Sequence, residues 1–268
     1  MTVSISVRLA FELEEPTDTL LQFEAAAIPE QRIISSETKL GPSDHLARVP
    51  AQDDIGERLM LRISGNYTID YDAQIEVNRN IPELTSLNRL HPHELPGAVI
   101  QYLFDSRYCQ ANKFQSFVHS EFGDLSGGAK IAAMRDWIMA NFTYAPGSSG
   151  GNTTALDTFT ERRGVCRDYS HVMIALARAA GFPARYCSVY APGVEPPDFH
   201  AVAEVFLSDP NGDPGVGAGT WQLVDATGMA NAREMVKIGV GRDAADVSFM
   251  TTFGATNLTY MEVNVTKT

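Results

Sequence analysis

The sequence has few cysteines and no long apolar run. Its 268 residues include three widely spaced cysteines, Cys109, Cys166 and Cys187, with no CxxC pair. This odd, scattered set excludes a disulfide framework, and free thiols are typical of a reducing cytosol, where we expect the protein to act. No run of 18 apolar residues occurs, and residues 1–10 lack the basic and apolar regions of a signal peptide. We therefore expect neither a membrane span nor a signal sequence.

Positive charge is also scarce, and no basic run occurs. The chain has 33 acidic and 21 basic residues, which gives a net charge of −12. Binding to nucleic acid or to an anionic membrane needs clustered positive charge, so the composition argues against both kinds of partner. We expect a peptide or protein substrate instead, and the oligomeric state is left open.

The composition does favour a substantial core. Hydrophobic residues make up 44% of the chain, which is enough for one large domain or two small ones. Alternating apolar and polar residues predict short strands at residues 3–9, 20–27, 31–37, 58–65 and 66–77. Short strands separated by turn residues predict a β-sandwich-like module over residues 1–95.

A proline-rich segment, residues 80–96, follows these strands and shows little periodicity, which predicts a link between two units. His91, His93 and Glu94 in this segment are residue types that bind metals. However, Pro92 prevents a helix that would align them, and no fourth ligand is evident. We interpret them as exposed loop residues and expect no metal there.

The remainder, residues 96–268, mixes helices and strands, so the fold class that we expect is α+β. Apolar periodicity predicts helices near residues 96–104, 115–122, 127–142, 154–163 and 166–180. Strands are predicted at residues 184–190, 200–207 and 221–225, with a glycine- and proline-rich hairpin loop over residues 209–219.

The helix that begins at Cys166 could carry a nucleophile. An apolar stripe runs from Val172 to Ala179, and Gly181 ends the helix. A thiol in the first turn meets free backbone N–H groups and the positive end of the helix dipole, which both favour the thiolate. A lone cysteine is more often a small buried hydrophobe, so the helix alone leaves both interpretations open.

His200 and Asp225 favour the catalytic interpretation. His200 opens one predicted strand and Asp225 closes the next, so in an antiparallel hairpin they lie side by side. The carboxylate can then orient the imidazole and leave its other nitrogen facing Cys166, which predicts a Cys-His-Asp triad. Taken singly, His200 could be a sheet-edge residue and Asp225 a turn cap. We reject His171, five residues after Cys166 on the same helix, as a rival base, and His119 has no supporting context.

Several segments together resemble the transglutaminase-like superfamily, most closely its bacterial cysteine protease branch with an N-terminal β module. The matching core segments are Arg163-Gly164-Val165-Cys166-Arg167-Asp168, Gly181-Phe182-Pro183-Ala184-Arg185-Tyr186, Phe199-His200-Ala201 with Glu204-Val205, and Val224-Asp225-Ala226-Thr227. Two further segments, residues 106–109 and 241–247, also match that branch. The resemblance covers residues 100–250 well, whereas the first 80 residues share only the general character of an N-terminal β module.

The resemblance implies a papain-like catalytic domain over residues 96–268. It implies Cys166 as the nucleophile, His200 as the general base and acid, and Asp225 as the orienting carboxylate. It also implies thioester chemistry, either hydrolysis of a peptide or amide bond or transfer of a glutamine acyl group to an amine. The backbone N–H of Cys166 should belong to the oxyanion hole.

We expect hydrolysis, because transfer needs a dry tunnel for the amine and nothing in the sequence indicates one. Val202 stands where the family usually has an aromatic residue, which argues mildly in the same direction. Transfer to an amine and a non-catalytic binding module are the alternatives. No calcium-binding loop motif is present, and we interpret Asp209, Gly212 and Asp213 as a solvated turn. We therefore expect no metal and no cofactor.

Overall fold

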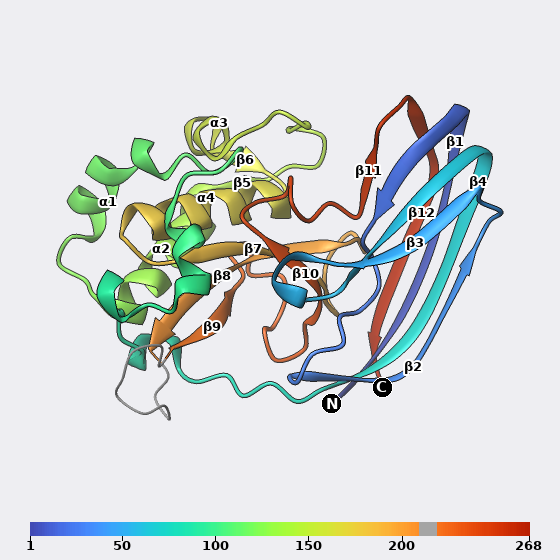
Figure 1. Cartoon of the computed structure of the whole chain (residues 1–268). Helices are drawn as coiled ribbons and strands as arrows, with labels where there is room; N and C mark the ends of the chain where they lie inside the picture. Colours follow the sequence, from blue (N-terminus) through green and yellow to red (C-terminus); the bar gives the residue numbers. More distant parts are fainter. Residues whose placement is uncertain (209–218) are drawn as a thin grey trace.

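The chain arranges its elements in three successive parts, which are a group of helices, a four-stranded sheet and a six-stranded sheet (Figure 1). The computed structural model describes residues 1–208 and 219–268. The predicted hairpin loop, apart from its last residue, and the cluster of Asp209, Gly212 and Asp213 lie outside these residues. The mixture of helices and antiparallel sheets confirms the expected α+β class.

The six-stranded sheet, here called the β module, is built on two long strands, β1 (Thr2–Leu21) and β4 (Glu57–Val77), which pair along almost their whole length. Their register shifts between Leu13 and Thr17. On one side of the shift they are flanked by β12 (Thr256–Lys267) and β2 (Gln31–Leu40), and on the other by β11 (Met250–Thr252) and β3 (His45–Pro50). Residues from both sides share one apolar core, so the module is sandwich-like although its strands form one sheet.

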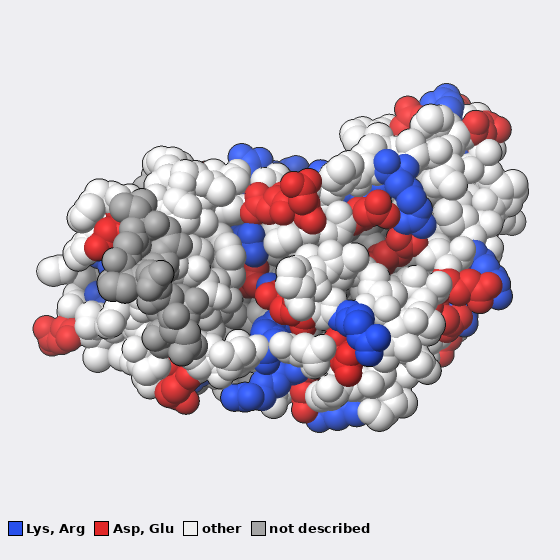
Figure 2. All heavy atoms as spheres, turned by 60° about the horizontal axis from the view of Figure 1, so that its bottom comes forward, with Lys and Arg blue, Asp and Glu red and all other residues white. Residues whose placement is uncertain are grey.

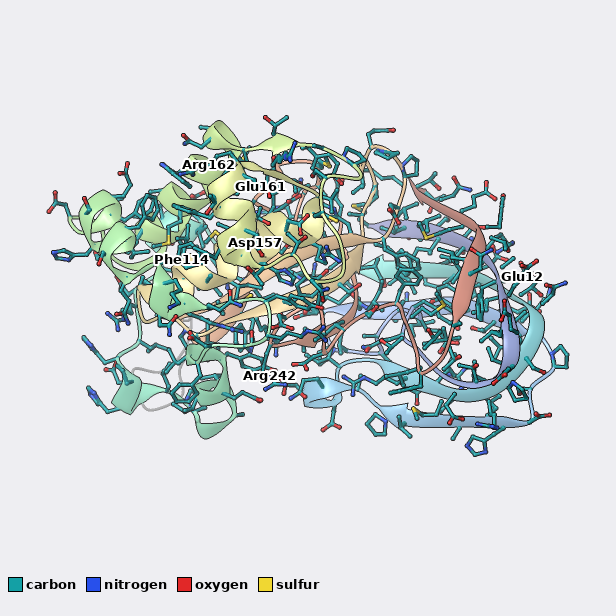
Figure 3. All side chains as sticks on the ribbon, turned by 90° about the horizontal axis from the view of Figure 1, so that it is seen from above. Glu12, Phe114, Asp157, Glu161, Arg162 and Arg242 are labelled. Atoms are coloured by element: carbon teal, nitrogen blue, oxygen red, sulfur yellow. The ribbon has the colours of Figure 1, made fainter. Side chains whose placement is uncertain are left out.

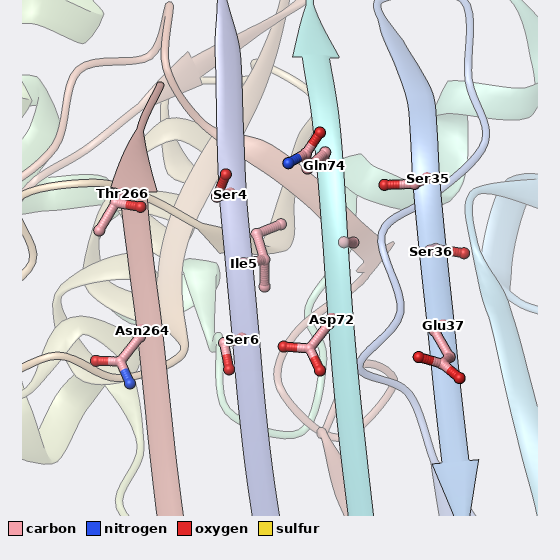
Figure 4. A pocket seen from close by; sticks show the side chains of 11 residues that line it. Ser4, Ile5, Ser6, Ser35, Ser36, Glu37, Asp72, Gln74, Asn264 and Thr266 are labelled. Carbon is pink, nitrogen blue, oxygen red and sulfur yellow. The ribbon is translucent and has the colours of Figure 1, made fainter.

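The outer face of the β module is polar because its strands alternate buried and exposed residues. A shallow hollow of about 480 Å³ lies across β12, β1, β4 and β2 on this face (Figure 4). Small hydroxyl and amide side chains line it, with carboxylates at one end: Ser4, Ser6, Ser35, Ser36, Gln74, Asn264, Thr266, Glu37 and Asp72. None of these residues lines the cleft at Cys166.

Three expectations for the β module need correction. The strand expected at residues 20–27 is the end of β1, which stops at Leu21, and the strands expected at 58–65 and 66–77 are the single strand β4. The C-terminal strands β11 and β12 also join this sheet, whereas the division at residue 95 assigned them to the catalytic unit. The reason is that β1 has a free edge alongside β4, and β12 pairs with that edge from Val3 to Leu13, with a register shift between Ala10 and Phe11.

The inner sheet has the strand order β10-β7-β8-β9 and is covered on both faces. Its strands are β7 (Ala184–Tyr190), β8 (His200–Ser208), β9 (Gly219–Val224) and β10 (Val236–Gly241). The helix α4 (Cys166–Ala179) packs on one face of β7 and β8. On the other face, Cys187, Val189 and Val202 pack with Ile55. Tyr190, Val236 and Ile238 join the apolar core of the β module, and the inner sheet lies between the helices and this module (Figure 1).

The remaining helices surround α4. The α-helices are α1 (Gln115–Phe122), α2 (Gly127–Asn141) and α3 (Ala155–Glu161), and β5 (Thr143–Tyr144) pairs with β6 (Arg163–Gly164). Short 3₁₀ helices occur at η1 (Gln52–Asp54), η2 (Leu84–Ser86), η3 (Pro92–Glu94), η4 (Gly97–Leu103) and η5 (Ala111–Lys113). The helices expected at residues 115–122, 127–142 and 166–180 are confirmed, and the one expected at 96–104 is a 3₁₀ helix.

Arg162 sets the direction in which the chain leaves α3. It caps the helix with a left-handed backbone, at a φ of 57°. Its guanidinium lies 4.2 Å from the centroid of the Phe159 ring and 4.5 Å from that of Trp137. These cation–π contacts hold an otherwise unfavourable backbone conformation and direct the chain through β6 into α4. Figure 3 labels Arg162 next to Glu161, the last residue of α3.

Candidate active site

Cys166 is the first residue of α4, as the sequence predicted. The carboxylate of Asp168 accepts a hydrogen bond from the backbone N–H of Val165 at 2.8 Å, which fixes the first turn. Gly164 is required for this packing, since a Cβ there would lie 2.6 Å from the Cβ of Asp168. The thiol thus stands at a firmly held helix N-terminus, and Cys166 is partly exposed.

His200 and Asp225 lie together at the ends of adjacent strands. The strands β8 and β9 pair antiparallel, with Ala203 opposite Val224, so Asp225 follows β9 beside the start of β8. His200 Nε2 and Asp225 Oδ2 are 3.1 Å apart. Both side chains are almost fully buried, at 0% and 5% exposed, which strengthens their interaction.

The second ring nitrogen of His200 is left for the thiol. Nδ1 is buried and has no hydrogen-bond partner among the described residues. Burial of the ring opposes its positive charge, but the hydrogen bond to Asp225 and the interaction with Cys166 outweigh burial and raise the pKa of His200 to about 9. The surroundings therefore favour an imidazolium beside the sulfur.

Asp225 is held as a carboxylate by four donors. Its Oδ1 accepts from the backbone N–H and the hydroxyl of Thr227, and its Oδ2 accepts from the backbone N–H of Ala230 as well as from His200. Burial tends to raise the pKa of Asp225, but these hydrogen bonds and the charge of His200 lower it. The residue both caps its turn and orients the histidine, so the two interpretations of Asp225 are compatible.

Cys166 and His200 open into a cleft of about 450 Å³. The Sγ atom of Cys166 is 4.0 Å from the backbone carbonyl oxygen of Phe199, the residue before His200. The ring of Phe199 stacks on Phe249 with centroids 4.8 Å apart, which makes one wall apolar. Polar and charged side chains line other parts of the cleft: Arg107, Tyr108, Arg167, Ser188, Asp198, Ser248 and Thr251. The cleft is large enough for an extended chain segment or a small amide.

The two outlying segments of the resemblance, residues 106–109 and 241–247, meet beside α4. The buried guanidinium of Arg178 donates to the hydroxyl of Ser106 and to the backbone carbonyl of Arg242. Asp243 accepts a hydrogen bond from the backbone N–H of Tyr108 at 2.9 Å. These contacts fix Tyr108 at the rim of the cleft, so the segments support the site rather than react.

His171 does not line the cleft at Cys166, in agreement with its rejection as a base. It is fully buried, its Nε2 accepts a hydrogen bond from the backbone N–H of Ala244 at 3.2 Å, and Tyr108 stacks on its ring. Burial and the nearby arginines lower the pKa of His171 to about 3, so the ring stays neutral. His119 is exposed on α1.

Two residues of the site were missed from the sequence, Tyr144 and Asp198. Tyr144 lies close to Cys166, and burial together with the nearby thiol raises the pKa of its hydroxyl to about 12. Asp198 lines the cleft two residues before His200. The Asp-Phe-His sequence offered a signal for Asp198, whereas Tyr144 reaches the site through β5 and has no such signal.

Val202, which stands where the family usually has an aromatic residue, does not line the cleft. It is fully buried among Cys187, Val189 and Val240. Its place in β8 explains this, because Ala201 and Ala203 face α4 and the side chains alternate, so Val202 lies on the opposite face of the sheet. Val202 is therefore no evidence for or against a tunnel that admits an amine.

The other potentially reactive groups are occupied or buried. Cys109 and Cys187 are fully buried free thiols, and burial raises the pKa of both. Glu94 accepts a hydrogen bond from the backbone N–H of His91 at 2.6 Å, and Pro92–Glu94 form the 3₁₀ helix η3 where the sequence indicated a loop. In residues 1–208 and 219–268, no group of three or more His, Cys, Asp or Glu side chains is arranged to hold a metal ion, and no helix is long and apolar enough to cross a membrane.

The comparisons with known proteins agree with this architecture. The sequence profile of the transglutaminase-like superfamily matches residues 115–226. The crystal structure of a protein from Cytophaga hutchinsonii, described as a "putative cysteine protease", superposes with a TM-score of 0.90 and 32% identity, over 99% of this chain and 90% of that one.

Curated relatives match over less than half of this chain. An uncharacterized protein of Mycobacterium leprae is 31% identical over 121 residues, which are 45% of this chain and 42% of the relative. An uncharacterized protein of Mycobacterium tuberculosis is 33% identical over 121 residues, 41% of this chain and 37% of the relative. The match thus spans less than half the length of these relatives. Together with the profile match, the near full-length likeness to the Cytophaga hutchinsonii structure shows that the chain belongs to the transglutaminase-like superfamily.

Proposed function

We propose that this protein is a cysteine hydrolase that cleaves a peptide or amide bond through a thioester on Cys166. The observation that carries the proposal is the arrangement of His200, which lines one cleft with Cys166. Its Nε2 is held by Asp225, while its buried Nδ1 has no hydrogen-bond partner in residues 1–208 and 219–268. A histidine fixed in this way can hold a proton beside the sulfur and release it during the reaction.

The reaction follows from these positions. The thiolate attacks the carbonyl carbon and forms the C–S bond, while the carbonyl oxygen takes the negative charge. The imidazolium of His200 then gives its proton to the amide nitrogen, the C–N bond breaks, and the amine leaves. Water attacks the thioester as His200 takes one of its protons, the C–S bond breaks, and the acid is released with the thiolate restored.

The oxyanion requires hydrogen-bond donors. The backbone N–H of Cys166 lies at the start of α4, where no intrahelical acceptor exists. Tyr144 lies close to Cys166, and its hydroxyl is the second donor that we assign. Replacing Tyr144 by phenylalanine removes only that hydroxyl and should lower kcat roughly 100-fold with little change in KM.

The test starts from the thiol, because the natural substrate is unknown. Iodoacetamide at pH 6 should alkylate Cys166 much faster than Cys109 and Cys187, which serve as buried internal controls. Mass spectrometry of the native protein gives the three rates. If Cys166 reacts no faster than the other two, the thiolate is absent and the protein is a binding module rather than an enzyme.

Activity is then sought with peptide, glutamine-amide and isopeptide substrates, with the Cys166→Ala variant as the control for contaminating enzymes. Time courses with and without a primary amine separate the fates of the thioester. Hydrolysis that proceeds at the same rate without forming an amine adduct supports the proposal. Accumulation of an amine adduct in place of the acid would show acyl transfer instead.

A further inference from the structure

The cleft contains a carboxylate that the proposed reaction does not use. Asp198 lies on the wall that carries His200, two residues along the chain. Its Oδ1 accepts the backbone N–H of the adjacent Phe199 at 2.7 Å. No lysine, arginine or histidine of the part of the chain that the structure describes makes an ion pair with it. The carboxylate is half-buried, and burial raises its pKa despite the opposing charge of His200.

The cations of the same cleft are directed elsewhere. The guanidinium of Arg167 donates to the backbone carbonyl of Gly150 at 2.6 Å and lies 3.4 Å from the carboxylate of Asp168. Arg107 lies over the ring of Tyr108, at 5.0 Å from its centroid. A partly desolvated carboxylate without a positive partner is unfavourable, and a cationic group on a ligand would relieve this.

The position of Asp198 indicates which half of a substrate it meets. The Phe199 carbonyl oxygen is 4.0 Å from the Cys166 sulfur, so this stretch of chain borders the reacting atoms directly. His200 must reach the leaving amine in order to protonate it, and therefore the amine half of the substrate lies along the His200 wall. Asp198 is on that wall.

We propose that Asp198 is a binding subsite for a cationic group in the amine half of the substrate. The preferred substrates are then amides or peptides whose leaving amine carries a second positive charge, such as a lysine or arginine side chain directly after the scissile bond. This specificity rests on the proposed hydrolase function. The neighbouring Phe199 and Phe249 rings provide an apolar surface for the methylene groups of such a side chain.

A binding experiment tests the subsite without a known substrate. The probes are n-pentylammonium and its neutral counterpart n-pentanol, and the readout is protection of Cys166 from iodoacetamide, in which the sulfur displaces iodide. Pentylammonium should slow alkylation with a saturable dependence, at least about 5-fold at its plateau, whereas pentanol should not. The Asp198→Asn variant should lose this protection, since it removes the charge and keeps the shape.

Asp124→Asn is the matched control, because Asp124 is an exposed carboxylate on the loop after α1. This variant should be protected like the wild type. Equal protection by the two probes, or full protection in Asp198→Asn, would show that Asp198 only shapes the Phe199 turn. A Cys166 that iodoacetamide does not label preferentially would instead contradict the hydrolase proposal, so the two failures are distinguishable.

Discussion

The two sheets of this protein use charged residues in opposite ways. In the β module, charged side chains lie on the exposed face, as in the pair of Arg62 and Asp18, which are 47% and 58% exposed. In the inner sheet they lie inside, and Glu204 is fully buried between Arg185 and Lys237. Exposed pairs contribute little to stability, whereas a buried charge depends on its partners. The comparison predicts that equivalent substitutions in the two sheets have very different effects.

The buried charges connect the two sheets. Arg185 on β7 bridges Glu204 on β8, at 2.7 Å, and Asp53 of the β module, at 2.8 Å. Lys237 on β10 contacts both Glu204 and Glu30 of the module. The surface in Figure 2 shows, by contrast, acidic and basic side chains interspersed over one face. The module is therefore attached through a network whose members need one another, which argues that it is an integral part of the fold.

The largest effect on stability is expected for Glu204→Gln. The glutamine keeps the shape but leaves Arg185 and Lys237 short of one negative charge in the interior. The free energy of unfolding should fall by about 3–5 kcal/mol, as is usual when one partner of a buried ion pair is removed. Denaturant titration followed by circular dichroism measures it. A loss below about 1 kcal/mol would mean that the network is solvated and that the two sheets do not differ as described.

A substitution of Asp225, which follows β9 of the same sheet, should lower catalytic turnover instead. Asp225→Asn removes the charge that holds the imidazolium of His200, whereas Glu204 lies within β8 and outside the cleft. Turnover should fall by roughly 10³-fold, about 4 kcal/mol in the barrier. Alkylation of Cys166 at pH 6 should become slow.

One result would contradict the distinction between Glu204→Gln, which should lower stability, and Asp225→Asn, which should lower reactivity. The folded fraction of Glu204→Gln should alkylate at Cys166 like the wild type. If Glu204→Gln slows alkylation as much as Asp225→Asn does, the buried network and the catalytic histidine are coupled, and the division of roles within the inner sheet is wrong.

The pH dependence of stability sharpens the comparison further. Burial opposes the charge of Glu204, but Arg185 and Lys237 outweigh it and lower the pKa of Glu204 to about 2, from an ordinary value of 4.5. Because the folded-state pKa is depressed, this stabilisation is present above pH 4.5 and is lost as the pH falls toward 2. The loss should be on the order of 3 kcal/mol, given the size of the shift.

Unfolding titrations at pH 5, 4, 3 and 2 measure this loss, and Glu204→Gln is the control. The variant lacks the ionising group, so its stability should fall less over the same range. Parallel curves for the two proteins would assign the acid sensitivity to other carboxylates, such as Asp225, whose pKa is also lowered in the folded state.

The local part of the site could be predicted from the sequence. The helix at Cys166 follows from its apolar stripe and glycine stop, and the meeting of His200 with Asp225 follows from two adjacent strands in a hairpin. Both inferences use residues close in sequence, where strand alternation and helix period dictate which face a side chain takes. The geometry agrees with them, while the catalytic roles await the experiments above.

The non-local part could not be predicted. The strand β12 pairs with β1 across almost the whole chain, with Val3 opposite Lys267, and no local pattern records such a partner. The family comparison at Val202 could not tell whether the residue lines the cleft, whereas alternation along β8 turns it away. Tyr144 gains importance only from its neighbours in space, and the sequence offered for Asp198 only its position two residues before His200.

The smallest effect is expected for Asp18→Asn in the β module. The substitution breaks the pair between Arg62 Nη1 and Asp18 Oδ1, which are 3.0 Å apart, but water can replace the lost contact at this exposed position. Stability should change by less than about 0.5 kcal/mol at neutral pH. Salt should matter little too, since the pair is already screened. Denaturant titrations of Asp18→Asn and Glu204→Gln under the same conditions compare their free energies of unfolding directly. A loss of several kcal/mol from Asp18→Asn would show that the outer face is covered in solution, and exposure would then no longer explain the difference between the two sheets.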